Sequence, residues 1–358
     1  MSDTPLPPDP LWAPEAVSPG RLGWLALLSS VFLFIAVGAS LQVVDPALGI
    51  WFSEIFLFFG TGWVLTRWSG RDPVAYAGLG WPGAAPVVLG LLLAIGNYVG
   101  LVVPLQFFSQ ALAPRSWTEA FDQMQIFDRY GGLALAFLSA GAILAAPLGE
   151  ELIFRGLFLQ GLLRSGWRTR VAILVSAAIF SAVHLDPVGF LARMELGALF
   201  GILFVRSANL WPGMAAHFGT NLTATLLYFA GRGDPTPTRD LRGELPGVLV
   251  ASAVGVAFMA VVLLVARRVR GAWGTPMAID PARPRVPLRK AAALWVIAAL
   301  TVLASWGILR WGPVARPSLQ GQASASGQLT GVEERSPAPV SRPRGSRAPA
   351  APVPPSPR

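Results

Sequence analysis

Apolar residues follow one another in long runs that short polar stretches interrupt. Most runs have the length, roughly 20 residues, that a helix needs to cross the hydrocarbon core of a bilayer. The pattern predicts an all-α protein, a polytopic transmembrane helical bundle of about nine spans. Pro147 and Gly149 predict a kink in the long fourth span, and Asp186-Pro187 predicts a tight turn after the fifth. The predicted spans are 22–44, 47–65, 84–108, 131–163, 171–185, 190–206, 210–229, 246–266 and 291–309.

Polar stretches at both ends and between the spans suggest five parts. Residues 1–20 are polar and rich in proline, and residues 310–358 are rich in Pro, Ser, Ala and Arg without periodicity. Both ends are therefore expected to be disordered. Between them we expect N-terminal transmembrane spans in 21–130, a central membrane domain in 131–230 and C-terminal transmembrane spans in 231–309.

Composition agrees with a membrane location. Hydrophobic residues make up 53% of the chain, charged residues 13%, and the mean hydropathy is +0.55. A soluble protein carries about 25% charged residues, so most of this surface is expected to face lipid. The chain has no cysteine, which excludes disulfides, thiolate metal sites and cysteine nucleophiles.

The net charge of +9 comes almost wholly from arginine, because Lys290 is the only lysine. Binding of nucleic acid would need a basic patch on a soluble face. These arginines instead occupy short loops between apolar runs and the tail, so we expect contact with the lipid bilayer and none with nucleic acid. The richness in Arg, Ala, Gly and Pro is typical of a GC-rich bacterial genome, which suggests a bacterial inner membrane.

Basic loops predict the orientation, because they remain on the cytoplasmic side of a membrane. With nine spans, all four basic groups fall on one side, so the N-terminus is predicted to be cytoplasmic and the tail external. The groups are Arg67 with Arg71; Arg164, Arg168 and Arg170; Arg206; and Arg267, Arg268, Arg270, Arg289 and Lys290.

Three apolar spans contain ionisable or amide side chains, which cost about 2.5–3.5 kcal/mol each on insertion and usually mark function. Together they contain both histidines of the chain, and counted from the basic loops they lie at a similar depth, about 16–22 Å from one membrane face. A shared site is therefore expected. The three clusters are Glu150–Arg155, Phe180–His184 and His217–Asn221.

Helical spacing gives each cluster a geometry. Glu151 and Arg155 are four residues apart with the acid first, the favourable order for an ion pair. Glu150 points about 100° away from its neighbour. His217 and Asn221 are also four residues apart and can point toward one place. Phe180 lies one turn before His184, so its ring can pack beside the imidazole.

Structural roles are the alternative for these residues. The Glu151–Arg155 pair can hold helices together, and a lone His or Asn commonly bonds between helices. We assign such structural roles to Glu54 and Asn97, because each stands alone in its span. Glu150 fits this interpretation least well, since a buried carboxylate without a partner must find one or become neutral.

A carboxylate beside an imidazole can deprotonate a water molecule, and a second His with an Asn can donate to a developing oxyanion. These are the parts for hydrolysis of an amide without a protein nucleophile. Glu-Glu-x-x-x-Arg, Phe-x-x-x-His and His-x-x-x-Asn in this order, over roughly 131–230, resemble the CPBP family of intramembrane glutamic endopeptidases. That family includes the CAAX proteases and the bacteriocin-processing or self-immunity (Abi) proteins.

The resemblance implies a role for each matching residue. Glu150 and His184 would activate water, His217 and Asn221 would stabilise the oxyanion, and Glu151, Arg155 and Phe180 would support them. The substrate would be a membrane-associated protein or peptide, as for CAAX-type members, which cut after a prenylated cysteine and release a C-terminal tripeptide. A non-catalytic immunity or scaffold protein is the alternative, and a transporter a weaker one, because no internal repeat is visible.

Zinc is the alternative to a mechanism without a cofactor. Catalytic zinc commonly takes two histidines and a carboxylate, which Glu150, His184 and His217 would supply. Against zinc, the His-Glu-x-x-His motif is absent, and Asn221 would have no evident task if His217 were a ligand. We therefore favour a metal-independent glutamate mechanism.

Overall fold

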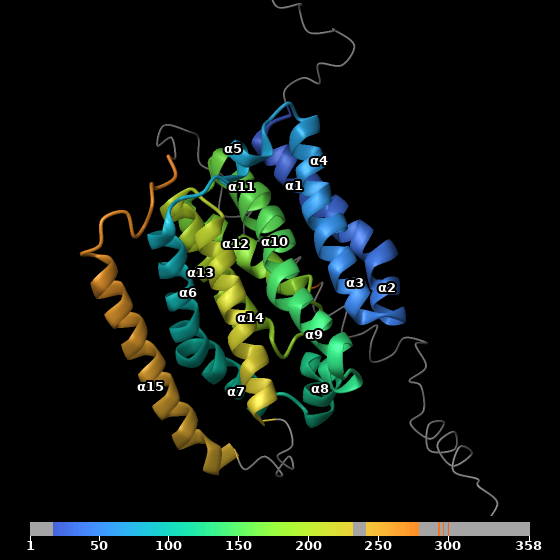
Figure 1. Cartoon of the computed structure of the whole chain (residues 1–358), viewed down its shortest axis with the longest axis vertical. Helices are drawn as coiled ribbons and strands as arrows, with labels where there is room; N and C mark the ends of the chain where they lie inside the picture. Colours follow the sequence, from blue (N-terminus) through green and yellow to red (C-terminus); the bar gives the residue numbers. More distant parts are fainter. Residues whose placement is uncertain (1–16, 232–240, 279–292, 294–295, 297–299, 301–358) are drawn as a thin grey trace, which may run out of the picture. The chain divides into compact units, whose positions relative to one another are not determined.

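The computed structural model describes residues 17–231 and 241–278, together with positions 293, 296 and 300. All regular structure within these residues is helical, so the predicted all-α bundle is confirmed (Figure 1). Most of the predicted span 291–309 lies outside the described residues, as do most of the N-terminal stretch and the whole tail 310–358. The division of the chain into five parts stays a prediction.

The first eight predicted spans each coincide with a helical segment, and four of these segments contain wider π-helical turns, labelled η. The N-terminal half comprises α1 (Pro19–Leu33), η1 (Phe34–Gly38), α2 (Ala39–Val44), α3 (Pro46–Phe52), η2 (Ser53–Gly60), α4 (Thr61–Trp68), α5 (Pro73–Ala77), α6 (Ala84–Asn97), η3 (Tyr98–Val102), α7 (Val103–Leu112), α8 (Arg115–Ala120) and the 3₁₀ helix η4 (Gln123–Arg129). The rest comprises α9 (Gly132–Ala140), η5 (Gly141–Ala145), α10 (Ala146–Glu151), η6 (Leu152–Leu159), α11 (Gln160–Arg164), α12 (Thr169–Ala182), α13 (Phe190–Ser207), α14 (Trp211–Gly231) and α15 (Leu241–Ala266).

Five of the described segments are long and apolar enough to cross a membrane, and α12 is apolar but shorter. The count of nine spans is therefore not established. Helix α13 carries Arg193, Glu195 and Arg206, and α14 is diluted by polar side chains, so both are less apolar than a typical span. The five segments are Pro19–Val44, Pro46–Trp68, Ala84–Leu112, Gly132–Arg164 and Gly243–Ala266.

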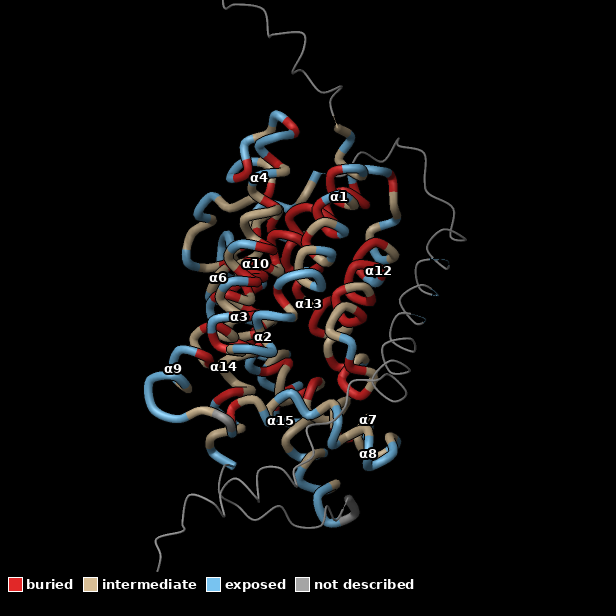
Figure 2. The backbone as a smooth tube through the Cα atoms, turned by 90° about the vertical axis from the view of Figure 1, so that its right-hand side faces the viewer, coloured by how far each residue is buried: buried red, intermediate tan, exposed pale blue. Residues whose placement is uncertain are grey.

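The segment Gly132–Arg164 lies at the centre of the packing. Every residue of its η6 portion is buried, with α1 packed on one side and α12 on another. Helix α14 packs against both α6 and α10, whereas α15 contacts α6 and η3 and leaves most of its apolar side chains exposed (Figures 1 and 2). The exposed side chains of α15 are those expected to face lipid.

The basic loops meet at one end of the bundle, as predicted. Arg71 donates to the carbonyl of Val17 at 2.6 Å, and the guanidinium groups of Arg71 and Arg164 lie 5.1 and 5.3 Å from the ring centre of Tyr76. Helix α14 begins beside this loop, because the Leu210 amide donates to the Gly78 carbonyl. Loops from four parts of the chain therefore share a surface around α5 and α11 (Figure 1). Arg289 and Lys290 lie outside the described residues.

The predicted distortion at Pro147 takes the form of a π-turn. The amide of Ala146 donates to the carbonyl of Gly141, five residues back. Pro147 has no N–H for the next acceptor in that register, the carbonyl of Ala142. The side-chain amide of Asn221 on α14 donates to that carbonyl instead, at 2.8 Å. Asn221 thereby joins α14 to the turn that precedes Glu150.

We predict that the cost in stability of losing this hydrogen bond depends on the presence of Pro147. Asn221→Ala leaves the Ala142 carbonyl without a donor and should lower the free energy of unfolding by about 1 kcal/mol, the usual size of an interhelical hydrogen bond. Pro147→Ala restores a backbone N–H, so the same asparagine substitution should cost less in that background. Thermal unfolding of the four variants in one detergent measures the coupling. Equal costs in both backgrounds would contradict this account of Asn221.

We also predict that the two ends of the bundle face opposite sides of the membrane. Because the chain has no cysteine, an introduced cysteine is the only thiol. In intact cells, a membrane-impermeant maleimide should label Ser116→Cys on α8 and should label Ser165→Cys, in the loop after α11, only after permeabilisation. A reporter fused after residue 320 should be external if 291–309 is a span. Equal labelling of both cysteines in intact cells would refute this topology.

Candidate active site

Three polar side chains from different helices converge inside the bundle. Glu150 lies in the last turn of α10, His184 follows α12, and His217 lies on α14. One carboxylate oxygen of Glu150 lies 3.8 Å from Nε2 of His184, and the other lies 3.7 Å from Nε2 of His217. The side chains are 13%, 23% and 7% exposed, respectively. The structure thus brings together three of the four residues to which sequence analysis assigned chemistry.

The backbone fixes the proton position on His184. Its Nδ1 lies 2.8 Å from the carbonyl of Phe180, and a carbonyl only accepts hydrogen bonds, so Nδ1 carries the proton. In the neutral ring, Nε2 then has a free lone pair, and this atom faces Glu150. His184 lies in the turn after α12 because the helix ends at Ala182, slightly earlier than predicted.

A buried network fixes His217. Arg155 donates to Glu151 at 2.6 Å and to the carbonyl of Gly197 on α13 at 3.2 Å. The predicted ion pair is therefore present, and both of its side chains are fully buried. The Glu151 oxygen that pairs with Arg155 also lies 3.0 Å from Nδ1 of His217. A carboxylate paired with arginine accepts, so Nδ1 of His217 is the donor and its Nε2 also faces Glu150.

Aromatic rings surround these charges. Phe180 lies edge-on to His184 with ring centres 5.0 Å apart, as its spacing predicted, and the Arg155 guanidinium lies 4.5 Å from its centre. Phe200 on α13 stacks on His217 at 4.9 Å. Sequence analysis missed Phe200, because a phenylalanine in an apolar helix gives no signal of its own.

The loop between α12 and α13 supports His184. Leu185 has a φ of +56°, a left-handed conformation that non-glycine residues seldom adopt. Asp186 accepts hydrogen bonds from the amides of Val188 and Gly189 at 2.8 and 3.0 Å and forms an ion pair with Arg193. The predicted Asp186-Pro187 turn is therefore present, and Arg193 ties it to the next helix.

Asn97 is buried and has a side-chain partner on α13, since its amide donates to Glu195 at 2.8 Å. This contact agrees with the structural role that we assigned to it. Asn221, in contrast, lies one turn along α14 from His217 and uses one amide hydrogen for Ala142. The amide group has a second hydrogen. Glu54, also assigned a structural role, lies beside the site and is treated below.

The chemistry of two imidazoles and a carboxylate would suit zinc, and both Nε2 atoms face Glu150, so metal independence stays a prediction. Within residues 17–231 and 241–278, no group of three His, Asp or Glu side chains is arranged to hold a metal ion. One argument against zinc is nevertheless withdrawn, because Asn221 has a task that does not involve the reaction.

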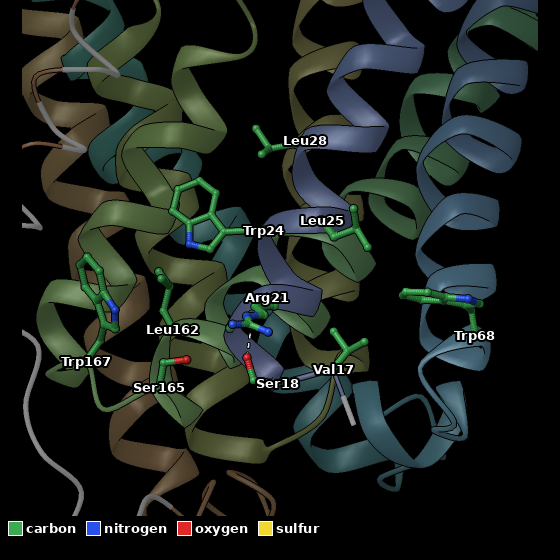
Figure 3. A pocket seen from close by; sticks show the side chains of 11 residues that line it. Val17, Ser18, Arg21, Trp24, Leu25, Leu28, Trp68, Leu162, Ser165 and Trp167 are labelled. Atoms are coloured by element: carbon green, nitrogen blue, oxygen red, sulfur yellow. Dashed lines mark hydrogen bonds between the residues drawn. The ribbon is translucent and has the colours of Figure 1, made fainter. Parts of the chain in front are cut away.

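A cavity of about 650 Å³ lies elsewhere, between α1, α4 and α11. Figure 3 shows Trp24, Trp68 and Trp167 on its walls, with Ser18 accepting the hydrogen bond from Arg21 at its floor. None of the candidate active-site residues lines it, so the cavity and the polar cluster are separate features.

Comparison with known proteins agrees with the geometry. Residues 132–223 match the family model of Type II CAAX prenyl endopeptidase Rce1-like proteins. No curated protein and no solved structure matches the chain. The matched residues include the whole polar cluster, from Glu150 to Asn221. The polar cluster thus lies in a region, residues 132–223, that is similar to the Rce1-like family of Type II CAAX prenyl endopeptidases.

Proposed function

We propose that the protein is an intramembrane endopeptidase that hydrolyses a peptide bond of a membrane-associated protein, through a water molecule activated by Glu150 and His184. The observation that carries this proposal is the convergence of one carboxylate and two Nε2 atoms within 3.7–3.8 Å. Three hydrogen-bond acceptors face one another there, and a water molecule is the simplest group that can donate to two of them.

Hydrolysis would proceed by proton transfer between these groups. Glu150 takes a proton from the water while the water oxygen attacks the peptide carbonyl carbon, with His184 orienting the water through Nε2. Glu150 then returns the proton to the leaving nitrogen as the C–N bond breaks. The buried surroundings strengthen each of these electrostatic interactions.

His217 and Asn221 would stabilise the oxyanion. Nε2 of His217 can donate once the ring takes up a second proton from water as the substrate binds, a proton that it keeps through the cycle, and the Glu151 carboxylate at Nδ1 lies where that charge is compensated. Asn221 can contribute the amide hydrogen that Ala142 does not use. Glu151, Arg155 and Phe180 hold these groups in place without reacting.

The substrate class follows from the family and the location. CAAX-type proteases act on lipid-modified C-terminal peptides, so we assign a CAAX-like or other C-terminal segment held at the bilayer. We place the protein in a bacterial inner membrane with a cytoplasmic N-terminus, on the basis of its basic loops and composition.

Glu150→Gln should lower kcat/KM on a farnesylated CAAX peptide by about 10²–10⁴, the usual contribution of a general base, while thermal unfolding stays unchanged. Glu119→Gln is the matched control, because Glu119 is an exposed glutamate that is not part of the candidate active site. A quenched fluorescent peptide in detergent micelles measures cleavage. Full activity of Glu150→Gln would contradict the mechanism. If the wild-type protein and Glu119→Gln also fail to cleave the peptide, the result would favour a scaffold or a different substrate.

Glu151→Gln should act differently, because it breaks a fully buried ion pair. Removal of one partner of such a pair costs about 3–5 kcal/mol, so this variant should unfold at a lower temperature and lose activity together. Thermal unfolding alongside the peptide assay separates the two glutamates. Normal stability of Glu151→Gln would show that the buried Arg155 guanidinium does not need the Glu151 charge.

A metal-independent enzyme should keep its activity after metal is removed. Protein dialysed against a chelator should contain no stoichiometric zinc by elemental analysis and should cleave at its original rate. Loss of activity that returns with added zinc would overturn this assignment and make His217 a ligand.

A further inference from the structure

A further carboxylate lies beside Glu150 and comes from outside the Rce1-like region. Glu54 lies on η2 and is 7% exposed. A Cβ atom on Gly149 would come within 2.7 Å of a Glu54 carboxylate oxygen and 2.4 Å of its carbonyl oxygen. The missing side chain of Gly149 therefore allows η2 to approach α10 directly next to Glu150.

The two carboxylates influence each other, and neither is fully hydrogen-bonded. Glu54 and Glu150 interact electrostatically, and each has an Oε2 atom that is buried and lacks a hydrogen-bond partner in the described structure. The nearby cations are already paired: Arg155 with Glu151, and Arg193 with Asp186.

The remaining titratable groups that face Glu150 are His184 from the loop after α12 and His217 from α14. In their neutral forms both present lone pairs, as shown above, and so offer no positive charge. Two neighbouring carboxylates in a buried site do not both ionise, because like charges repel strongly at low dielectric. A single proton held between them would remove this repulsion.

We propose that Glu54 is a positioning residue of the hydrolytic site, a neutral carboxyl that shares one proton with Glu150 and so keeps Glu150 ionised. The catalytic meaning of this proposal rests on the proposed function. Before reaction the pair holds one proton. It holds two after Glu150 deprotonates the attacking water, and one again after Glu150 protonates the leaving nitrogen, so the cycle is balanced without another donor.

The chain offers a matched control. Glu195 is also an intramembrane glutamate on a helix of the bundle, but it accepts a hydrogen bond from Asn97 at 2.8 Å. Glutamine at position 54 resembles a neutral glutamic acid in shape and polarity. If Glu54 acts as a neutral carboxyl, Glu54→Gln should keep most of the activity, whereas Glu54→Ala should lose it.

The pH–rate profile of the full-length enzyme tests this role. In Glu54→Ala, the acidic limb of the residual kcat/KM should move to higher pH by about one unit, because the neutral carboxyl that stabilises ionised Glu150 is gone. Glu54→Gln, whose amide can still donate, and Glu195→Gln should leave the limb in place. A Glu54→Ala profile with the wild-type limb would show that Glu54 only packs against Gly149.

Infrared titration of the buried carboxyl groups tests the shared proton without any substrate. The spectral change caused by Glu54→Gln should differ when Glu150 is also replaced by glutamine, and the change caused by Glu195→Gln should not. Additive changes for Glu54 and Glu150 would overturn the proposal even in an active enzyme. If the two spectral changes are coupled but the protein cleaves no peptide, the shared proton would be supported and the protease function would be rejected. Thermal unfolding confirms that each variant is folded.

Discussion

Complete burial of the Arg155 guanidinium is the constraint on which the rest of the site depends. A buried cation costs several kcal/mol unless charge and hydrogen bonds compensate it. Glu151 supplies the charge, the carbonyl of Gly197 supplies an acceptor, and the rings of Phe180 and Phe200 cover its faces. Because the same Glu151 oxygen also accepts from His217, satisfying the arginine fixes the orientation of an imidazole on another helix. Glu150, one residue earlier, is left to face the open nitrogens of both histidines. The reactive geometry is thus a by-product of charge compensation.

The helical distortions serve the same arrangement. A regular α-helix through Pro147 would clash with the preceding turn, and the wider turn η5 avoids this while leaving one carbonyl to α14. The residue that accepts this task, Asn221, lies on the same helix as His217, so the hydrogen bond sets the distance between α14 and the Glu150 segment. The site is therefore held by two independent hydrogen bonds between these segments, one from His217 to the Glu151 carboxylate and one from Asn221 to a backbone carbonyl.

Local patterns in the sequence predicted the parts of the site that depend on one helix. The spacing of Glu151 and Arg155 predicted their ion pair, and that of Phe180 and His184 predicted their ring contact, because both follow from helical geometry alone. Contacts between helices were not predictable in this way. Phe200 and Glu54 lie in other spans, and the acceptor of Asn221 is a backbone atom exposed by a proline. Within the described residues, length and hydropathy single out five spans, because α12 is short and α13 and α14 carry polar side chains, so the count of nine stays a prediction.

The missing side chain of Gly149 links the evolution of the second span to that of the domain at residues 132–223. Any larger residue at this position would push the backbone of η2 away, because the carbonyl oxygen of Glu54 lies within 2.4 Å of where the Cβ would be. An acidic side chain at position 54 would then no longer reach the neighbourhood of Glu150. An acid at 54 beside Glu150 therefore depends on glycine at 149, so relatives that have this acid should also have the glycine. A recombinant that joins this domain to the N-terminal spans of another protein would inherit the histidines and Glu150 but not this pairing.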